Sequence, residues 1–96
     1  MAHSSSRKVQ RVMARESAAW QGITLTRSVQ DGMVRSIQRG MSVFLGKNSN
    51  RLSNFAVRHN GEWYAVAYDR IRGQIESFHP PEYLDQYRAL LDGESC

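Results

Sequence analysis

Residues 52–68 read LSNFAVRHNGEWYAVAY, and this stretch decides the fold. Two runs rich in apolar residues flank the pair Asn60-Gly61. A two-residue type I′ turn needs positive φ at both central positions, and Asn-Gly is a pair that readily adopts it. The stretch therefore predicts an antiparallel β-hairpin in which Phe55 lies opposite Val66.

Both faces of this hairpin carry apolar side chains, because successive residues of a strand point to opposite faces. One face is expected to hold Phe55, Val57, His59, Glu62, Tyr64 and Val66, and the other Arg58, Trp63, Ala65 and Ala67. A strand pair that is apolar on both faces is typical of the centre of a sheet. We therefore expect at least one helix to pack against it.

Shorter runs on either side extend the hairpin into a sheet. Met41 to Leu45 and Gln74 to Phe78 predict strands, joined to the hairpin by a polar loop over residues 46–51 and a turn over residues 69–73. Pro80-Pro81 ends the last strand, since proline cannot donate to a β-ladder. The sequence thus predicts a four-stranded antiparallel meander.

Helical spacing predicts two helices before the sheet. The first covers Arg7 to Trp20, and its inner face is expected to hold Val9, Val12, Met13 and Trp20. The second begins at Thr26 or at Ser28 and ends at Arg39, before Gly40. Its inner face is expected to hold Leu25, Val29, Met33 and Ile37.

A third helix is predicted after the sheet, from Glu82 to Leu91. Its inner face is expected to hold Tyr83, Leu84, Tyr87, Leu90 and Leu91. We therefore expect one α+β domain over residues 1–96, with two N-terminal helices, a four-stranded antiparallel β-meander and a C-terminal helix. Residues 1–6 are expected to be a disordered tail and residues 92–96 a frayed end.

Length and composition exclude several classes of protein. The 96 residues suffice for one modest core and not for two domains. No apolar run approaches the ~20 residues of a membrane span. The N-terminus lacks the apolar segment of a secretory signal, so we expect a cytoplasmic protein with no membrane partner. Cys96 is a single cysteine, and no spacing fits zinc, so we expect no disulfide, no metal and no cofactor.

The charge is distributed unevenly along the chain. Residues 1–60 hold ten basic and two acidic residues, whereas residues 61–96 hold three basic and seven acidic ones. Eleven of the thirteen basic residues are arginine, which suits bidentate contacts to phosphate. The pattern predicts a polyanionic partner for the basic half. The alternative is that the two halves neutralise each other across the surface.

Candidate contacts to this partner fall on the two N-terminal helices. Arg7, Arg11 and Arg15 repeat every fourth residue and so form one stripe. On the second helix, Asp31 and Arg35 are spaced to form an ion pair. The expected nucleic-acid contacts are Arg7, Arg11, Arg15, Arg35, Arg39, Arg51 and Trp63. Solvated arginines and a core tryptophan are the alternatives.

Residues 22–79 resemble the small bacterial ribonuclease-toxin fold of RelE-like, BrnT-like and colicin D-like domains. The shared pattern is a capped helix that ends in glycine, an antiparallel sheet with an Asn-Gly hairpin, and a final strand that reads GQIESF over residues 73–78. The resemblance implies metal-independent RNA cleavage by basic side chains, often with a helical histidine, and by a serine or threonine on a late strand. Ser77 matches that hydroxyl. Residues 7–20 and 26–39 contain no histidine, so enzymatic activity stays open.

RNA cleavage of this kind needs a base, an acid and a cation at one phosphate. The expected catalytic residues are His79, Ser77, Arg58 and His59. Each histidine also has a structural interpretation. His79 at the end of a strand would pack on Tyr83, and His59 would form a surface pair with Glu62 across the hairpin.

Two functions of different classes follow from these patterns. The first is a small RNA-binding protein related to the ribonuclease toxins, with cleavage left open. The second is a non-enzymatic regulator of phage or plasmid type whose basic half binds an acidic surface of a cognate or host protein. No sequence feature assigns an oligomeric state. Binding that weakens steeply with salt distinguishes the first function from the second.

Overall fold

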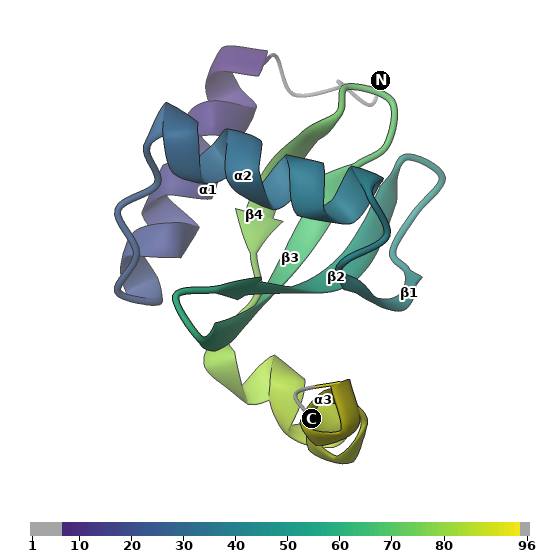
Figure 1. Ribbon diagram of the computed structural model, residues 1–96. Coiled ribbons are helices and arrows are strands. Elements are labelled where there is room, and N and C mark those ends of the chain that lie inside the picture. Colours follow the sequence, from purple (N-terminus) through teal and green to yellow (C-terminus); the bar gives the residue numbers. More distant parts are fainter. Residues whose placement is uncertain (1–6, 95–96) are drawn as a thin grey trace.

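The computed structural model describes the backbone of residues 7–94 and the side chains of residues 13–93. The elements in chain order are α1 (Arg7–Trp20), α2 (Arg27–Gln38), β1 (Val43–Lys47), β2 (Leu52–His59), β3 (Glu62–Asp69), β4 (Gln74–Phe78), a 3₁₀ helix η1 (Pro81–Tyr87) and α3 (Arg88–Glu94). The strands form one antiparallel sheet in the order β1-β2-β3-β4 (Figure 1). This confirms the predicted α+β class with two N-terminal helices and a four-stranded meander.

The central hairpin has the predicted register. Asn60 and Gly61 adopt φ angles of 51° and 81°, as a type I′ turn requires. The predicted pairs are all present: Phe55 with Val66, Val57 with Tyr64, and His59 with Glu62. The two faces expected for the hairpin are therefore the two faces of the folded sheet.

The pairing of β3 with β4 contains an irregularity that the sequence did not predict. Tyr68 pairs with Ile75, whereas the preceding residue of β3 pairs with Ser77, so Glu76 is an extra residue in β4. A bulge of this kind interrupts the alternation of side chains. As a result, Ile75 and Phe78 are both buried in the same cluster, on one face of the sheet.

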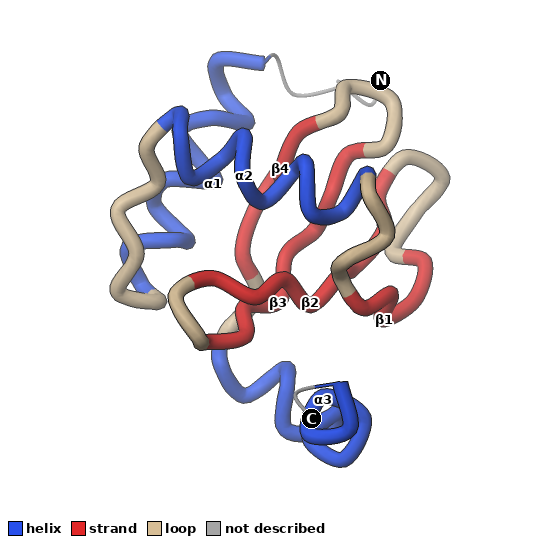
Figure 2. The backbone as a smooth tube through the Cα atoms, in the orientation of Figure 1, coloured by secondary structure: helices blue, strands red, loops and turns tan. Residues whose placement is uncertain are grey.

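Each face of the sheet is covered by a different part of the chain (Figure 2). On the face covered by α1 and α2, the buried cluster consists of Ala18, Ile23, Met33, Ile37, Val57, Val66, Tyr68, Ile75 and Phe78. On the face covered by η1 and α3, the smaller cluster consists of Leu45, Ala56, Ala65, Leu84 and Leu91. The sheet is thus the middle of three layers. We call α1 and α2 the helical layer, and η1 with α3 the C-terminal layer.

The first helix packs through a face that was not predicted. Trp20, expected inside, is 80% exposed, and Met13 is 40% exposed. Val9 and Val12 lie outside the residues whose side chains the structure describes. The buried face instead consists of Ala14, Ser17 and Ala18. These small side chains allow α1 to approach β4 closely, and a close-packed contact of this kind has no room for the large ones.

The close approach lets α1 satisfy backbone groups at the edge of β4. The Phe78 N–H donates to Ser17 Oγ at 2.9 Å, and that hydroxyl in turn donates to the Met13 carbonyl at 2.8 Å. The side-chain amide of Gln21 donates to the carbonyl of His79. An edge strand otherwise leaves such groups open to pairing with another chain. The first helix therefore protects this edge of the sheet.

The N-cap of the second helix is the first of the two predicted candidates, Thr26 and Ser28. Thr26 is the N-cap, because its Oγ1 accepts a hydrogen bond from the Val29 N–H at 3.2 Å. The helix ends at Gln38, and Gly40 follows it with a φ of 73°, as predicted. The buried residues of α2 are Met33 and Ile37. The predicted helix is therefore confirmed, with its start settled in favour of Thr26.

The predicted C-terminal α-helix is instead a 3₁₀ helix followed by an α-helix. A 3₁₀ helix has three residues per turn, so Leu84 and Tyr87 lie on the same side of η1. Leu84 and Leu91 are buried, whereas Leu90, expected on the inner face, is 48% exposed. Because the number of residues per turn changes between η1 and α3, Leu91 and not Leu90 lies on the same side as Leu84. The last helix continues to Glu94, through part of the expected frayed end.

Candidate functional site

The arginines of the helical layer whose side chains the structure describes are open to solvent. Four of them are exposed and form no ion pair with any residue that the structure describes, and we call these the helical arginines: Arg15, Arg27, Arg35 and Arg39. The ion pair expected between Asp31 and Arg35 is not formed. Against these four arginines the described part of the helical layer holds two acidic residues, Glu16 and Asp31, so its net charge is positive.

Acidic residues of the C-terminal half pair with other arginines. Arg51 binds Asp69 at 2.9 Å and Glu76 at 3.0 Å. Asp85 lies 3.8 Å from Arg88, in the C-terminal layer. None of the helical arginines takes part in these pairs, so the two halves of the chain do not neutralise each other there.

Arg51, an expected nucleic-acid contact, is partly exposed and is paired with a buried carboxylate. Asp69 is completely buried, at 0% exposure. Its Oδ1 accepts hydrogen bonds from the N–H groups of Ile71 and Arg72, both at 3.0 Å, while Oδ2 faces Arg51. A buried carboxylate needs partners of this kind, because burial removes its hydration. Arg51 therefore stabilises the turn between β3 and β4.

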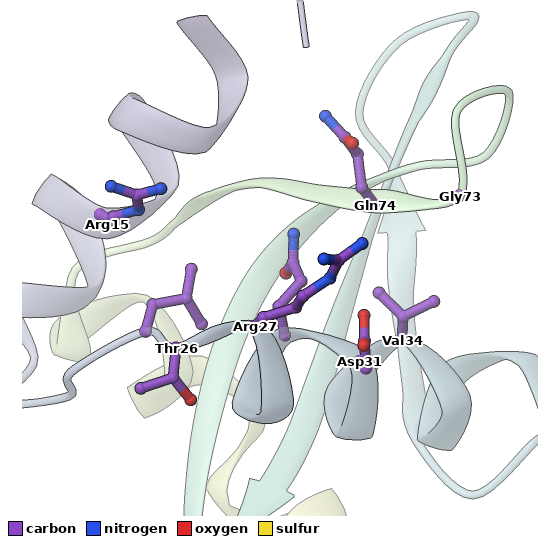
Figure 3. Close-up of a pocket in the computed structure, with 9 residues that line it drawn as sticks. Arg15, Thr26, Arg27, Asp31, Val34, Gly73 and Gln74 are labelled. Carbon is purple, nitrogen blue, oxygen red and sulfur yellow. The ribbon is translucent and has the colours of Figure 1, made fainter. Parts of the chain in front are cut away.

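A groove of about 770 Å³ lies between the helical layer and β4 (Figure 3). The residues that line it are Arg15, Leu25, Thr26, Arg27, Gln30, Asp31, Val34, Gly73 and Gln74. Arg27 extends from α2 toward β4, and Arg15 enters from the side of α1 (Figure 3). Leu25 and Val34 contribute apolar surface. Two helical arginines thus share one concave site, which no pattern in the sequence had predicted because three separate elements form it.

Arg58 and Trp63, expected to contact phosphate and bases, contact each other. The Arg58 guanidinium lies 5.4 Å from the centre of the Trp63 ring, a cation–π arrangement. Trp63 also packs against the buried cluster of the C-terminal layer. These two residues therefore lie at the hairpin end of the sheet, apart from the groove.

The ring of His79 is stacked on Tyr83, with ring centres 4.4 Å apart and an angle of 18° between the planes. Its Nε2 lies 2.8 Å from Asn54 Oδ1. Because a carbonyl oxygen only accepts hydrogen bonds, the neutral ring carries its proton on Nε2. Burial lowers the pKa of His79 below its ordinary value. The ring is therefore held neutral and in one orientation.

Asn54 is the centre of this polar cluster, and the sequence analysis had not singled it out. Its Oδ1 also accepts from Asn48 Nδ2 at 3.1 Å, and its Nδ2 donates to the Tyr83 hydroxyl at 3.0 Å. The pKa of Tyr83 is raised, first by burial and then by the neighbouring Tyr87, against a smaller lowering by Asn54. Every polar atom of the Asn54 side chain is thus engaged within the protein.

The other two expected catalytic residues lie elsewhere. Ser77 is on the edge strand β4 and lines a shallow pocket of about 290 Å³ beside α1. The ring of His59 lies 6.5 Å from that of Tyr64, on the face covered by the helical layer. His79 and Arg58 belong to the opposite face. The structure therefore does not bring the four expected catalytic residues together.

Several expected features fall outside the described side chains. Arg7 and Arg11 are in α1, but their side chains are not among those described, and Cys96 lies beyond the last described residue. Within the described part of the chain, no group of histidine, cysteine, aspartate and glutamate is arranged to hold a metal ion. No helix in that part has the length and apolar character needed to cross a bilayer.

Comparison with known proteins assigns no family to this chain. No protein-family model matches it, and neither does any curated protein or solved structure. The resemblance to ribonuclease toxins therefore stays a prediction.

Proposed function

We propose that this protein binds single-stranded RNA through the helical arginines. The observation that carries the proposal is that these four side chains are exposed and form no ion pair with residues 13–93, while Arg51 and Arg88 have acidic partners. A guanidinium group without a carboxylate partner keeps its charge and its N–H donors available for phosphate oxygens. Release of counterions from the nucleic acid then supplies most of the binding free energy.

The groove favours a single strand over a duplex. It is concave, and it combines the apolar residues Leu25 and Val34 with the charge of Arg27. Bases of a single strand can leave the stack and enter such a site, whereas bases of a duplex remain stacked and paired. We therefore expect single-stranded RNA to bind more tightly than duplex DNA of the same length.

The proposal concerns binding and not cleavage. His59 and His79 belong to opposite faces of the sheet, and the Nε2–H of His79 donates to Asn54. Cleavage by general acid–base catalysis requires two groups that reach the same phosphate. We therefore expect RNA to be recovered intact after incubation with the protein.

The test is fluorescence anisotropy with a labelled single-stranded RNA over a series of salt concentrations. Each phosphate contact contributes about −0.7 to the slope of log K against log salt, so four contacts predict a slope of about −3. The double variant Arg35→Gln/Arg39→Gln removes two of the helical arginines and should reduce the slope by about 1.4. Electrophoresis of the recovered RNA, with duplex DNA measured in parallel, completes the experiment.

The matched control is Arg88→Gln, which removes the same charge from the C-terminal layer, where Arg88 already has Asp85 as a partner. This variant should bind RNA as the unmodified protein does. Equal loss of affinity in the control and in the Arg35→Gln/Arg39→Gln variant would overturn the proposal. Absence of RNA binding at micromolar protein, together with a tight acidic protein partner in a pull-down, would favour the regulator instead.

A further inference from the structure

The groove between α1, α2 and β4 has two chemically different parts. Arg15 and Arg27 contribute guanidinium groups that form no ion pair with described residues. Asp31, next to Arg27 on α2 in Figure 3, contributes a carboxylate that forms no ion pair either. Opposite charges on neighbouring turns of one helix would normally attract each other. Here they remain separate, so the groove offers donors for an anion and an acceptor for a hydrogen-bond donor.

The position of Arg27 is unfavourable for the helix that carries it. Arg27 is the first residue of α2, and α2 has no acidic residue in its first turn. The N-terminal end of a helix bears partial positive charge, so a cation there is destabilising and an anion is favourable. An anionic ligand in the groove would relieve this repulsion. Arg27 is therefore placed where it suits a ligand and not the free helix.

The second part of the groove contains an unsatisfied acceptor. Gln30 Oε1 is buried and accepts no hydrogen bond from the described residues. Buried polar atoms without a partner are uncommon and call for an explanation. Gln30 and Asp31 are adjacent in sequence and both line the groove. When the Gln30 side chain turns into the groove that it lines, its oxygen and the Asp31 carboxylate form an acceptor pair suited to N–H or O–H groups of a ligand.

We propose that the groove binds one nucleotide, with its phosphate at Arg15 and Arg27 and the donor groups of its base or ribose at Gln30 and Asp31. Carboxylate and amide oxygens accept from the amino and hydroxyl groups of nucleotides. The volume of about 770 Å³ lies within the range of ordinary small-molecule sites. The inference deepens the proposed function and rests on it for the source of the nucleotide, which is a residue of the RNA strand.

The direct test is titration of the full chain with the four ribonucleoside 5′-monophosphates and with inorganic phosphate, followed by calorimetry or NMR. At least one nucleotide should bind about tenfold or more tightly than inorganic phosphate, because the acceptor pair is used only by the nucleotide. Arg27→Gln should weaken nucleotide and phosphate alike, by about tenfold or more. Arg88→Gln, which removes the same charge from the C-terminal layer, is the matched control and should change neither.

Asp31→Asn distinguishes the role of the arginines in the groove from that of the acceptor pair. Removal of the carboxylate should raise the affinity for inorganic phosphate about fivefold, because a repulsive charge is lost. The same substitution should not raise the affinity for the preferred nucleotide, because a strong acceptor for its donor groups is lost as well. Equal gains for both ligands would overturn the acceptor role of Asp31 and with it the inference. Far-ultraviolet circular dichroism confirms that each variant is folded.

The outcomes distinguish this inference from the proposed function. RNA binding with the expected salt slope, but nucleotides no tighter than inorganic phosphate, would overturn the groove inference and leave the proposed function intact. Nucleotide binding at the groove without RNA binding would assign the site to free nucleotides and overturn the proposed function. Competition of the tightest nucleotide against labelled RNA, lost in Arg27→Gln, would support both.

Discussion

The helical layer and the C-terminal layer differ in how their polar side chains are used. On the face of the sheet covered by the C-terminal layer, Asn54 and His79 satisfy each other and Tyr83 through hydrogen bonds and stacking. In the helical layer, Arg15 and Arg27 have no carboxylate partner among the described residues. His79, which has the most suggestive chemistry in the sequence, is thus engaged by neighbours within the protein. The arginines without such a partner include Arg27, which no pattern in the sequence had marked.

The largest expected effect is a loss of stability on removal of a polar group that is engaged within the protein. Asp69→Ala removes a fully buried carboxylate and leaves Arg51 and two backbone N–H groups without it. Breaking a buried pair by removing one partner lowers the free energy of unfolding by about 3–5 kcal/mol. Urea denaturation should show a lower midpoint with an unchanged slope.

Asp85→Ala is the control for this prediction. Asp85 is an acidic residue in an exposed pair with Arg88, and such pairs contribute at most about 1 kcal/mol. A similar shift of the midpoint for both variants would contradict the structural role assigned to Asp69. Any RNA affinity of Asp69→Ala should be retained at temperatures where it is folded.

Asn54→Ala tests the polar cluster beneath the C-terminal layer. The variant leaves His79 and Tyr83 without their shared partner, and each partly buried group loses a hydrogen bond. We expect the free energy of unfolding to fall by about 2 kcal/mol, with RNA binding unchanged. Asn48→Ala, which removes an exposed partner of Asn54, should have a smaller effect. Loss of RNA binding in a folded Asn54→Ala variant would place function in the C-terminal layer and break the comparison.

Arg27→Glu should have opposite effects on stability and on binding. The substitution replaces a cation by an anion in the first turn of α2, which is favourable for the helix by up to about 1 kcal/mol. Thermal unfolding should therefore occur at a higher temperature, while RNA and nucleotide binding are lost. A stabilising change that removes binding identifies a residue kept for function. A destabilised variant would indicate that Arg27 supports the fold instead.

The smallest expected effect is a dependence of stability on pH. Burial lowers the pKa of His79 below 6.5, so the unfolded chain takes up a proton at a higher pH than the folded chain. The contribution of the neutral ring to stability is fully present above pH 6.5. It is lost as the pH falls from 6.5 to the folded pKa. Urea midpoints measured across this window should decline with acid, and the decline should be weaker in His79→Gln.

The elements that are specified by residues close together in the chain, such as turn and capping residues, could be predicted from the sequence. The Asn60-Gly61 turn set the register of the central hairpin, and capping residues marked the ends of α2. The buried face of α1 could not be predicted in this way. Helical spacing favoured Trp20, but the close approach of α1 to β4 admits only small residues such as Ala18. Burial on that helix depends on its neighbour and not on its own apolar pattern.

The candidate site was predictable only in part. An excess of arginine in the basic half predicted an anionic partner, and Arg15 remains available for one. Arg51 could not be separated from the available arginines, because its partners Asp69 and Glu76 are distant in the sequence. The same holds for the groove, which forms where three elements meet.

The hydrogen bond from Phe78 to Ser17 has a consequence for the spacing of the groove walls. Ser17 lies two positions after Arg15 on the same helix, and it fastens that helix to the rim of the sheet. The distance between α1 and β4 at the groove is therefore set by this hydrogen bond to the strand, and not by the short segment that joins α1 to α2. Lengthening that segment should leave the width of the groove unchanged, whereas Ser17→Ala should increase it.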